Sequence, residues 1–297
     1  MISPQLLLDL PANPGADHLG GALVIGPDKN IYLITGDGDS CEYDSCINGV
    51  EDSVINAQTA NDENGDSPQG RGGILRVIQD GQVVNAKGIL GNDHPLDMYY
   101  AYGIRNSFGI DFDPVTGRLW DTENGPGFGD EINLVELGFN SGWHKVQGIW
   151  PITNYELLDP TPEKKGYFDK QQIFDAPDNL VDFNGEGRYS NPELTWNIPR
   201  GITAIKFLNS EKLGKQYEND MFVGDYLGAL YHFDLNKDRT QLELEDMLSD
   251  KIVDKREEIM DAVFVEGFPT IVDIEVSPDG YLYVLSYNGS IQKVVYQ

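Results

Sequence analysis

The stretch that decides the fold runs from Ile271 to Leu285 and reads IVDIEVSPDGYLYVL. Two apolar segments, 271–276 and 281–285, flank Ser277-Pro278-Asp279-Gly280, in which the Pro and the Gly favour a tight turn. A further segment, GSIQKV, follows at 289–294. Short apolar segments joined by turns of this kind are typical of antiparallel strands. This stretch therefore predicts three strands of one meandering sheet.

Similar patterns occur three more times upstream. Apolar strands, turns rich in Pro, Asp and Gly, and aromatic-containing strands recur at 23–33 with 73–77, at 109–120 with 131–135, and at 202–207 with 220–233. Repeated sets of three or four short strands are the sequence signature of propeller blades. We therefore predict an all-β fold, a β-propeller with four recognisable blades and little helix. Its predicted strands include 22–26, 31–35, 108–112, 118–121, 221–224, 281–285 and 291–295.

Two segments do not follow the repeat. The Pro-, Asp- and Tyr-rich connection from Pro151 to Pro192 is interpreted as a loop on the top face of the propeller. The charge-rich stretch from Leu242 to Ile259 is compatible with a short helix or with an irregular insertion.

The charge of the chain excludes some partners. It carries 49 acidic and 21 basic residues, a net charge of −28. Such a field repels nucleic acid and anionic membranes, because phosphate binding needs clustered Lys and Arg. A solvated acidic surface and the binding of divalent cations by some of the carboxylates both remain open.

The chain contains no apolar run near the roughly 20 residues that span a bilayer. Leu6-Leu7-Leu8 is too short for a signal sequence and lacks its basic flank, so we expect no export signal within these residues. Cys41 and Cys46 can close a small disulfide loop, which would suit an oxidising compartment, or remain two free thiols.

Four motifs in the first half of the chain carry a family resemblance. They are Asp17-His18-Leu19-Gly20-Gly21, Tyr102-Gly103-Ile104-Arg105-Asn106, Glu123-Asn124-Gly125-Pro126 and Asp130-Glu131-Ile132-Asn133. Together they resemble the soluble quinoprotein glucose dehydrogenases and aldose sugar dehydrogenases. The resemblance implies a six-bladed propeller that holds pyrroloquinoline quinone (PQQ) and calcium. It also implies oxidation of the C1 hydroxyl of a sugar to the lactone, with electrons passed to a separate acceptor. We expect residues 1–297 to form a single propeller domain that lacks the family's first blades.

The same resemblance assigns a catalytic base. His18 matches the family's general base, which removes the hydroxyl proton, since imidazole titrates near the working pH. Asp37, in the pair Gly36-Asp37, matches the carboxylate that orients this base. The alternative is that His18 only caps a loop at the start of a strand.

The remaining motifs match cofactor and metal positions. Arg105 and Asn106 match the pair that contacts the cofactor, where a guanidinium can stabilise the reduced quinone. Gly125 and Pro126 match positions whose carbonyl oxygens hold the PQQ calcium, and Glu131 matches a carboxylate of a second, structural calcium site. The alternative for Arg105 is a structural role, in which it bridges two blades through backbone carbonyls.

The sequence departs from the family where the cofactor's carboxylates should be bound. The family has a Lys after a Phe-Val-Gly strand, and here Phe222-Val223-Gly224 is followed by 225–227, DYL. An Arg-x-Arg pair is replaced by Thr270 and Val272. Each charge-assisted contact contributes about 1.5–3 kcal/mol, so the losses predict PQQ binding weakened by several orders of magnitude. Arg200 is a candidate for partial compensation.

Two functions therefore remain in view. The first is a PQQ- and calcium-dependent sugar dehydrogenase, exported to a periplasmic or extracellular compartment. The second is a non-catalytic or altered-ligand propeller that is stabilised by calcium and binds carbohydrate or protein. A lactonase-like calcium hydrolase is a third class, but no spacing of carboxylates in the chain selects it.

Overall fold

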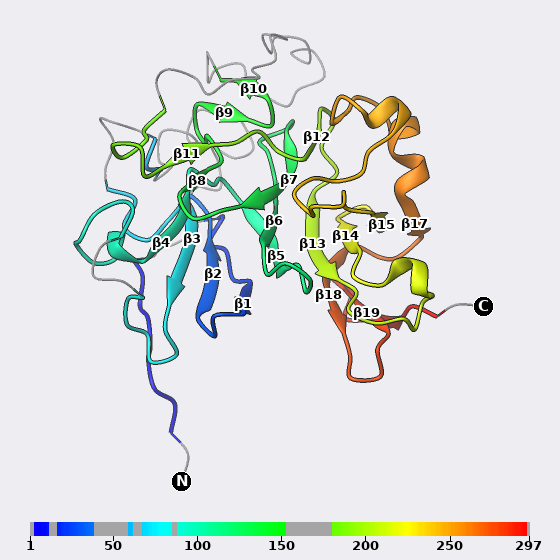
Figure 1. Ribbon diagram of the computed structural model, residues 1–297, viewed down its shortest axis with the longest axis horizontal. Coiled ribbons are helices and arrows are strands. Elements are labelled where there is room, and N and C mark those ends of the chain that lie inside the picture. The colour runs from blue at the N-terminus through cyan, green and yellow to red at the C-terminus, as the bar shows by residue number, and fades with distance from the viewer. Residues whose placement is uncertain are drawn as a thin grey trace.

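The computed structural model describes residues 3–11, 17–38, 59–61, 67–84, 88–152 and 180–295. Cys41, Cys46 and most of the connection from Pro151 to Pro192 lie outside these residues. Within them, four largely antiparallel sheets follow one another along the chain, and a two-stranded hairpin forms a fifth, smaller sheet (Figure 1). The predicted all-β propeller fold is confirmed, and the helical segments are short 3-10 turns.

Three sheets have the four-stranded order of a propeller blade, and the last has three strands. The first consists of β1 (Leu23–Ile25), β2 (Ile31–Thr35), β3 (Gly73–Val77) and β4 (Tyr99–Tyr102), extended by β8 (Phe139–Asn140) and β11 (Arg188–Tyr189). The second consists of β5 (Ser107–Phe112), β6 (Leu119–Glu123), β7 (Asp130–Val135) and β12 (Leu194–Trp196), with β16 (Ile252–Val253) beside β12. The third consists of β13 (Ile202–Phe207), β14 (Met221–Asp225), β15 (Ala229–Phe233) and β17 (Val263–Glu266). The fourth consists of β18 (Ile271–Val276), β19 (Leu282–Ser286) and β20 (Ile291–Lys293).

The other elements are small. β9 (Val146–Gln147) and β10 (Trp150–Pro151) form a hairpin. The 3-10 turns are η1 (Leu96–Met98), η3 (Lys215–Tyr217), η4 (Asp246–Leu248) and η5 (Arg256–Ala262). The stretch from Leu242 to Ile259 thus contains short 3-10 turns and the two-residue strand β16.

Each sheet packs its apolar face against the next sheet, which places the cores between blades. Ile34 and Ile74 of the first sheet meet Leu119 of the second. Trp196 of the second sheet packs with Tyr231 of the third. Leu230 of the third sheet shares a core with Ile274 and Val284 of the fourth. Burial of such side chains contributes about 1.5–3 kcal/mol each, so the stacked blades stabilise one another.

A β-bulge recurs in the first strand of three sheets. Register shifts fall between Ser107 and Gly109 in β5, between Ile202 and Ala204 in β13, and between Ile271 and Asp273 in β18. The extra residues are Phe108, Thr203 and Val272, and all three line the same central cavity. A bulge re-aims a side chain that would otherwise follow the strand's alternation.

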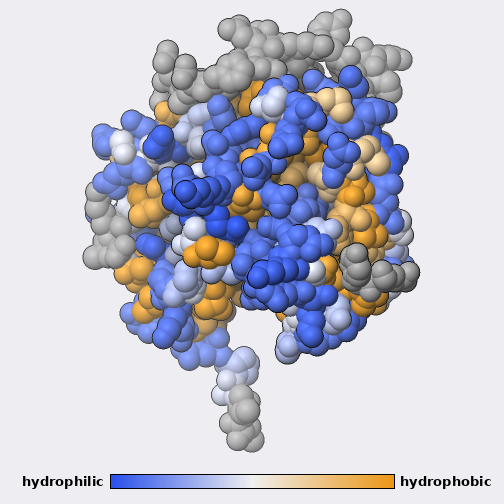
Figure 2. All heavy atoms as spheres, turned by 45° about the vertical axis from the view of Figure 1, so that its right-hand side comes forward, coloured by the Kyte–Doolittle hydropathy of each residue, from blue (hydrophilic) through white to orange (hydrophobic). Residues whose placement is uncertain are grey.

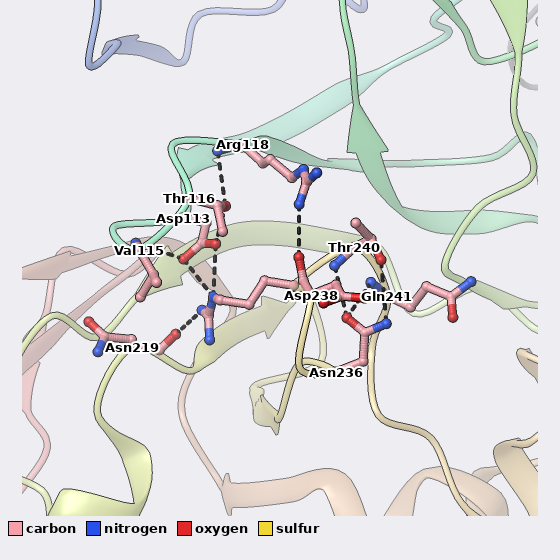
Figure 3. Close-up of polar contacts among 10 residues, drawn as sticks. Asp113, Val115, Thr116, Arg118, Asn219, Asn236, Asp238, Thr240 and Gln241 are labelled. Atoms are coloured by element: carbon pink, nitrogen blue, oxygen red, sulfur yellow. Dashed lines mark hydrogen bonds and ion pairs between the residues drawn. The ribbon is translucent and has the colours of Figure 1, made fainter.

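A buried ion pair joins the second and third sheets (Figure 3). Asp113, directly after β5, is fully buried and accepts hydrogen bonds from Arg239 Nε at 2.8 and 2.9 Å. Arg239 also donates to the carbonyl oxygen of Asn219, and Thr116 donates to Asp113. Burial alone would raise the pKa of Asp113, but the hydrogen bonds from Arg239, Thr116 and Val115 N–H outweigh it and lower that pKa.

One face of the molecule is mostly polar (Figure 2). Figure 2 shows a face dominated by hydrophilic residues, with apolar side chains in separate patches. None of the helices in the described part of the chain is long and apolar enough to cross a membrane.

Candidate active site

The first strands of the four sheets are β1, β5, β13 and β18 (Figure 1). Residues of these strands, or directly before them, line a central cavity of about 720 Å³. The loop before β1 contributes Asp17 and His18 to its wall, and the start of the second sheet contributes Asn106. Lys206 of β13 also lines it, but its ammonium group lies 2.8 Å from Glu275 and 3.7 Å from Asp111. Among the described residues of this wall, Lys206 is thus the one lysine, and it faces several carboxylates.

His18 and Asp37 lie in direct contact at the edge of the cavity. His18 Nδ1 lies 2.8 Å from Asp37 Oδ1, and the Asp37 side chain is buried. An ionised carboxylate only accepts hydrogen bonds, so this contact places the imidazole proton on Nδ1 and leaves Nε2 as the basic nitrogen. Gly36 permits the approach, because a Cβ there would lie 2.2 Å from the carbonyl oxygen of His18.

Asp37 is held by two further groups. Trp143 Nε1 donates to its second oxygen, Oδ2, at 2.7 Å. Its own backbone N–H donates to the carbonyl oxygen of Arg105 at 2.8 Å. A carboxylate fixed on both oxygens cannot rotate away from the imidazole, so Trp143 belongs to the site. The sequence contained Trp143 in the Gly142-Trp143 pair, but no local pattern linked its indole to Asp37.

Arg105 and Asn106 lie next to this pair, at the start of the second sheet. The Arg105 guanidinium lies 5.4 Å from the ring centre of Trp143, and its Nη1 donates to the carbonyl oxygen of Asn124 at 2.9 Å. Its backbone N–H donates to Glu123 Oε1 at 2.7 Å. Arg105 therefore donates a hydrogen bond to a backbone carbonyl, as it would if its role were structural. It also lies beside the His18–Asp37 pair.

Gly125 and Pro126 form a half-buried turn after β6. Gly125 N–H donates to Asp130 Oδ1 at 3.0 Å, and Asp130 Oδ2 accepts from the N–H groups of Arg200 and Gly201 at 2.7 Å. Gly125 has no space for a side chain, because a Cβ would lie 1.7 Å from the carbonyl oxygen of Phe128. Asp130 thus fixes this turn to the third sheet, a role that the sequence did not reveal.

Glu131 lies in a fully buried group of carboxylates. The strand register places Glu131 opposite Glu123 and Asn133 opposite Asp121. Ser141 Oγ lies 2.7 Å from Glu123 Oε2 and 3.1 Å from Glu131 Oε2, so its single proton can be donated to either carboxyl group. Burial is the main cause that raises the pKa of Asp121 to about 7 and that of Glu131 to about 8.

Three oxygen atoms around this group have no hydrogen-bond partner among the residues that the structure describes. They are Asp121 Oδ1, Asn133 Oδ1 and Gln147 Oε1. Buried oxygen atoms without donors are costly, and carboxylate and amide oxygens are the ligands that calcium prefers. The unpaired oxygens near Glu131 are therefore of the type that calcium prefers, although both oxygens of Glu131 itself already accept hydrogen bonds, Oε1 from Gln147 and Gly148 and Oε2 from Asn133.

The positions where the family binds the cofactor's carboxylates are differently occupied. Asp225 stands where the family has the lysine that follows the Phe-Val-Gly strand. It is buried and accepts hydrogen bonds from Arg200 Nε and Nη2 at 2.9 Å and from Tyr231 Oη at 2.8 Å. Arg200 is therefore engaged with Asp225. Val272 lines the cavity, and Asp273 and Glu275 follow it along β18. This part of the wall does not fit a tricarboxylate.

Comparison with known proteins assigns the family. The sequence profile described as Glucose / Sorbosone dehydrogenase matches residues 3–293, nearly the whole chain. The chain belongs to this family. The aldose sugar dehydrogenase YliI of Escherichia coli is one relative. It is 25% identical over 281 residues, which cover 95% of this chain and 60% of the relative. Quinoprotein glucose dehydrogenase B of Acinetobacter calcoaceticus is 34% identical over 157 residues, 51% of this chain and 30% of the relative.

Solved structures support the propeller fold of this family member. The apo form of the soluble aldose sugar dehydrogenase from Escherichia coli matches with a TM-score of 0.57 and 22% identity, covering 93% of this chain and 63% of that one. The PQQ-bound aldose sugar dehydrogenase of Streptomyces coelicolor matches with a TM-score of 0.54 and 20% identity, covering 94% and 58%. The chain thus spans less than two thirds of the length of these relatives.

Proposed function

We propose that the chain is an oxidoreductase of the PQQ- and calcium-dependent aldose dehydrogenase type. It would oxidise the C1 hydroxyl of a sugar to the lactone and pass the electrons to a separate acceptor. The observation that carries this proposal is the His18–Asp37 contact at the wall of the central cavity, next to Asn106. Family membership supports the same reaction class.

In this proposal His18 is the general base. Its Nε2 takes the proton of the C1 hydroxyl, and Asp37 stabilises the imidazolium that forms. Trp143 keeps Asp37 in place through the indole N–H. PQQ, when bound, supplies the acceptor for the hydride that leaves C1. Arg105 and Asn106 would contact the cofactor, and the positive charge of Arg105 favours its reduced form.

The fit to PQQ is uneven. His18, Arg105 and Asn106 suit the reacting end of the cofactor, whereas Asp225, Thr270 and Val272 offer no cation to its carboxylates. The wall of the cavity adds Asp273 and Glu275, which repel an anionic ligand. We therefore expect PQQ to bind far more weakly than it would with cationic side chains at positions 225, 270 and 272.

Titration calorimetry with PQQ in calcium tests this account. Thr270→Arg combined with Val272→Arg should lower the Kd for PQQ at least about tenfold, since one charge-assisted contact contributes more than the 1.4 kcal/mol of a decade. A control variant, Gln241→Arg with Ser249→Arg, adds the same charge at exposed positions and should leave the Kd nearly unchanged. If the wild type binds as tightly as the first variant, other groups hold the carboxylates. If neither binds PQQ, the proposal of a PQQ enzyme is wrong.

Calcium is part of the proposal at two places. The carbonyl oxygens of Gly125 and Pro126 would hold the ion beside the cofactor, and Glu131 would hold a structural ion. The buried oxygens without donors near Glu131 support the second site.

Calcium should also change how stability depends on pH. In the metal-free protein, the pKa values of Asp121 and Glu131 are raised from 3.8 and 4.5 to about 7 and 8. Between the unfolded and the folded pKa values the folded state holds protons that the unfolded state releases. The stability contributed by these two groups is therefore fully present below about pH 4 and is lost as the pH rises to about 8. A bound ion keeps the carboxylates ionised and offsets this loss.

Thermal unfolding at several pH values measures this effect. After treatment with EDTA the Tm should fall between pH 5 and pH 8, and calcium should raise the Tm more at pH 8 than at pH 5. Glu131→Gln should reduce the calcium effect, whereas Glu266→Gln, at an exposed ion pair with Arg256, should not. An equal response of both variants would argue against calcium at Glu131.

The second candidate function is a non-catalytic propeller that binds carbohydrate or protein. The observation in its favour is that Arg200 and Asp225 form an ion pair with each other. Arg200 is therefore not available to bind the carboxylates of PQQ in place of the family's lysine. Export to a periplasmic or extracellular compartment remains part of the dehydrogenase proposal.

A further inference from the structure

A second group of potential ligands lies in the third sheet, away from the central cavity. It comprises Asp220, directly before β14, His232 in β15 and Asp234 directly after β15. Met221 pairs with Phe233 and Phe222 with His232, so the antiparallel register brings Asp220 opposite Asp234. Residues two apart in a strand share a face, which adds His232 to the same side.

The three side chains converge on one point. His232 Nε2 lies 2.9 Å from Asp220 Oδ2 and 3.9 Å from Asp234 Oδ1, and one ligand atom of each residue lies within 4.8 Å of the others. Metal–ligand bonds to imidazole nitrogen and carboxylate oxygen are about 2.0–2.2 Å long, so ligand atoms around one ion lie up to about 4.4 Å apart. Small side-chain movements would therefore suffice to enclose an ion.

The imidazole is fixed in this orientation by aromatic neighbours. The ring centres of Tyr217, Phe222 and Phe264 lie 4.9, 5.3 and 6.2 Å from that of His232. A ligand whose ring is packed on several sides loses little entropy when a metal binds.

The charges around the group are not balanced by the protein. Among the described residues, the recorded ion pairs of Asp220 and Asp234 are with His232 and include no lysine or arginine. Two carboxylates thus approach one neutral or singly charged ring, and a divalent cation would relieve their repulsion.

An opening leads to the group. A cavity of about 420 Å³ is bordered by His232 and Asp234 and by further carboxylates, among them Glu243, Glu245 and Asp261. Its described lining contains no lysine or arginine. A cation can therefore reach His232 and Asp234 along an acidic path, and water can complete its coordination.

We propose that Asp220, His232 and Asp234 bind a divalent transition-metal ion, with zinc as the best match. Imidazole nitrogen together with two carboxylate oxygens suits zinc, whereas calcium takes oxygen ligands alone. The ion would tie the start of β14 to the end of β15. The site shares no residue with the central cavity or with the calcium positions proposed above.

Zinc titration of the whole chain, in excess calcium and after removal of other metals, tests this site. We expect one zinc ion per chain, and His232→Gln should raise the Kd at least about 100-fold, since even indirect partners of a ligand are worth 10–100-fold. Asp234→Asn changes an exposed side chain and should weaken binding in a protein that folds normally. Cobalt should give visible absorption bands in the wild type that are lost in both variants.

His94→Gln is the matched control. His94 also lies near a carboxylate, with Nδ1 3.8 Å from Asp97 Oδ1, but no third ligand from the described part of the chain joins this pair. Its replacement should leave zinc binding and the cobalt spectrum unchanged. Zinc binding that survives both His232→Gln and Asp234→Asn, or no zinc binding to the wild type, would show that Asp220 and His232 form only an ion pair.

Discussion

Replacement of His18 by Ala should reduce the rate of sugar oxidation by about 10²–10⁴-fold, the usual contribution of a positioned general base. The Kd for PQQ should stay nearly unchanged, because this residue acts on the substrate proton. The physical reason lies in the contact with Asp37, which leaves Nε2 of His18 as the basic nitrogen at the cavity wall. Steady-state rates with an aldose and an artificial electron acceptor, together with titration by PQQ, separate the two quantities.

The control is His94→Ala, which removes an imidazole that is largely exposed and lies outside the cavity wall. It should leave both the rate and the Kd unchanged. Arg105→Ala should instead reduce both rate and affinity, since Arg105 is proposed to face the cofactor. A His18→Ala protein that oxidises sugar at the wild-type rate would remove His18 from the mechanism.

Arg239→Met should lower the free energy of unfolding by about 3–5 kcal/mol, the cost of leaving one partner of a buried ion pair alone. The change keeps much of the side-chain volume but leaves Asp113 fully buried and without its guanidinium (Figure 3). The pKa of Asp113 is lowered in the folded protein, so its contribution is present above the ordinary value of 3.8 and is lost as the pH falls below it. The difference between variant and wild type should therefore shrink in acid. Denaturant unfolding at pH 7 and at low pH measures both values.

Arg118→Met is the matched control in the same region, because Arg118 makes an exposed hydrogen bond to the carbonyl oxygen of Asp238 at 2.8 Å. It should cost about 1 kcal/mol or less. Asp113→Asn combined with Arg239→Met should recover part of the lost stability, since no charge is then left buried. A loss below about 1 kcal/mol for Arg239→Met alone would contradict the view that this pair joins the two sheets.

The strands within each blade could be predicted from the sequence because their signal is local. Predicted strands at 31–35, 221–224 and 281–285 appear as β2, β14 and β19 with bounds that differ by at most one residue. The outermost strands β12 and β17 were missed, although each completes a four-stranded sheet. β12 has three residues and reaches β7 only after a long connection, and β17 follows a charge-rich stretch. Neither gives a periodic pattern of its own.

The residues of the candidate site could likewise be predicted only in part from the sequence. His18 and Asp37 were paired because both lie in short motifs that a family resemblance can match. The contact of Trp143 with Asp37 spans 106 residues, so only the folded chain reveals it. The engagement of Arg200 with Asp225 was missed for the same reason, since Arg200 lies just before β13 and Asp225, 25 residues later, is the last residue of β14. Local sequence specifies which groups are present, and the packing of blades decides which of them meet.

The recurring bulges have a consequence for how such a cavity can change over evolution. Phe108, Thr203 and Val272 are the extra residues of three strands and stand outside the regular pairing of their sheets. Exchange of one of them alters the shape or polarity of the cavity wall with little effect on the register of the ladder. Three equivalent positions around one axis can thus vary independently. A single scaffold can in this way accommodate differently shaped ligands without redesign of its cores.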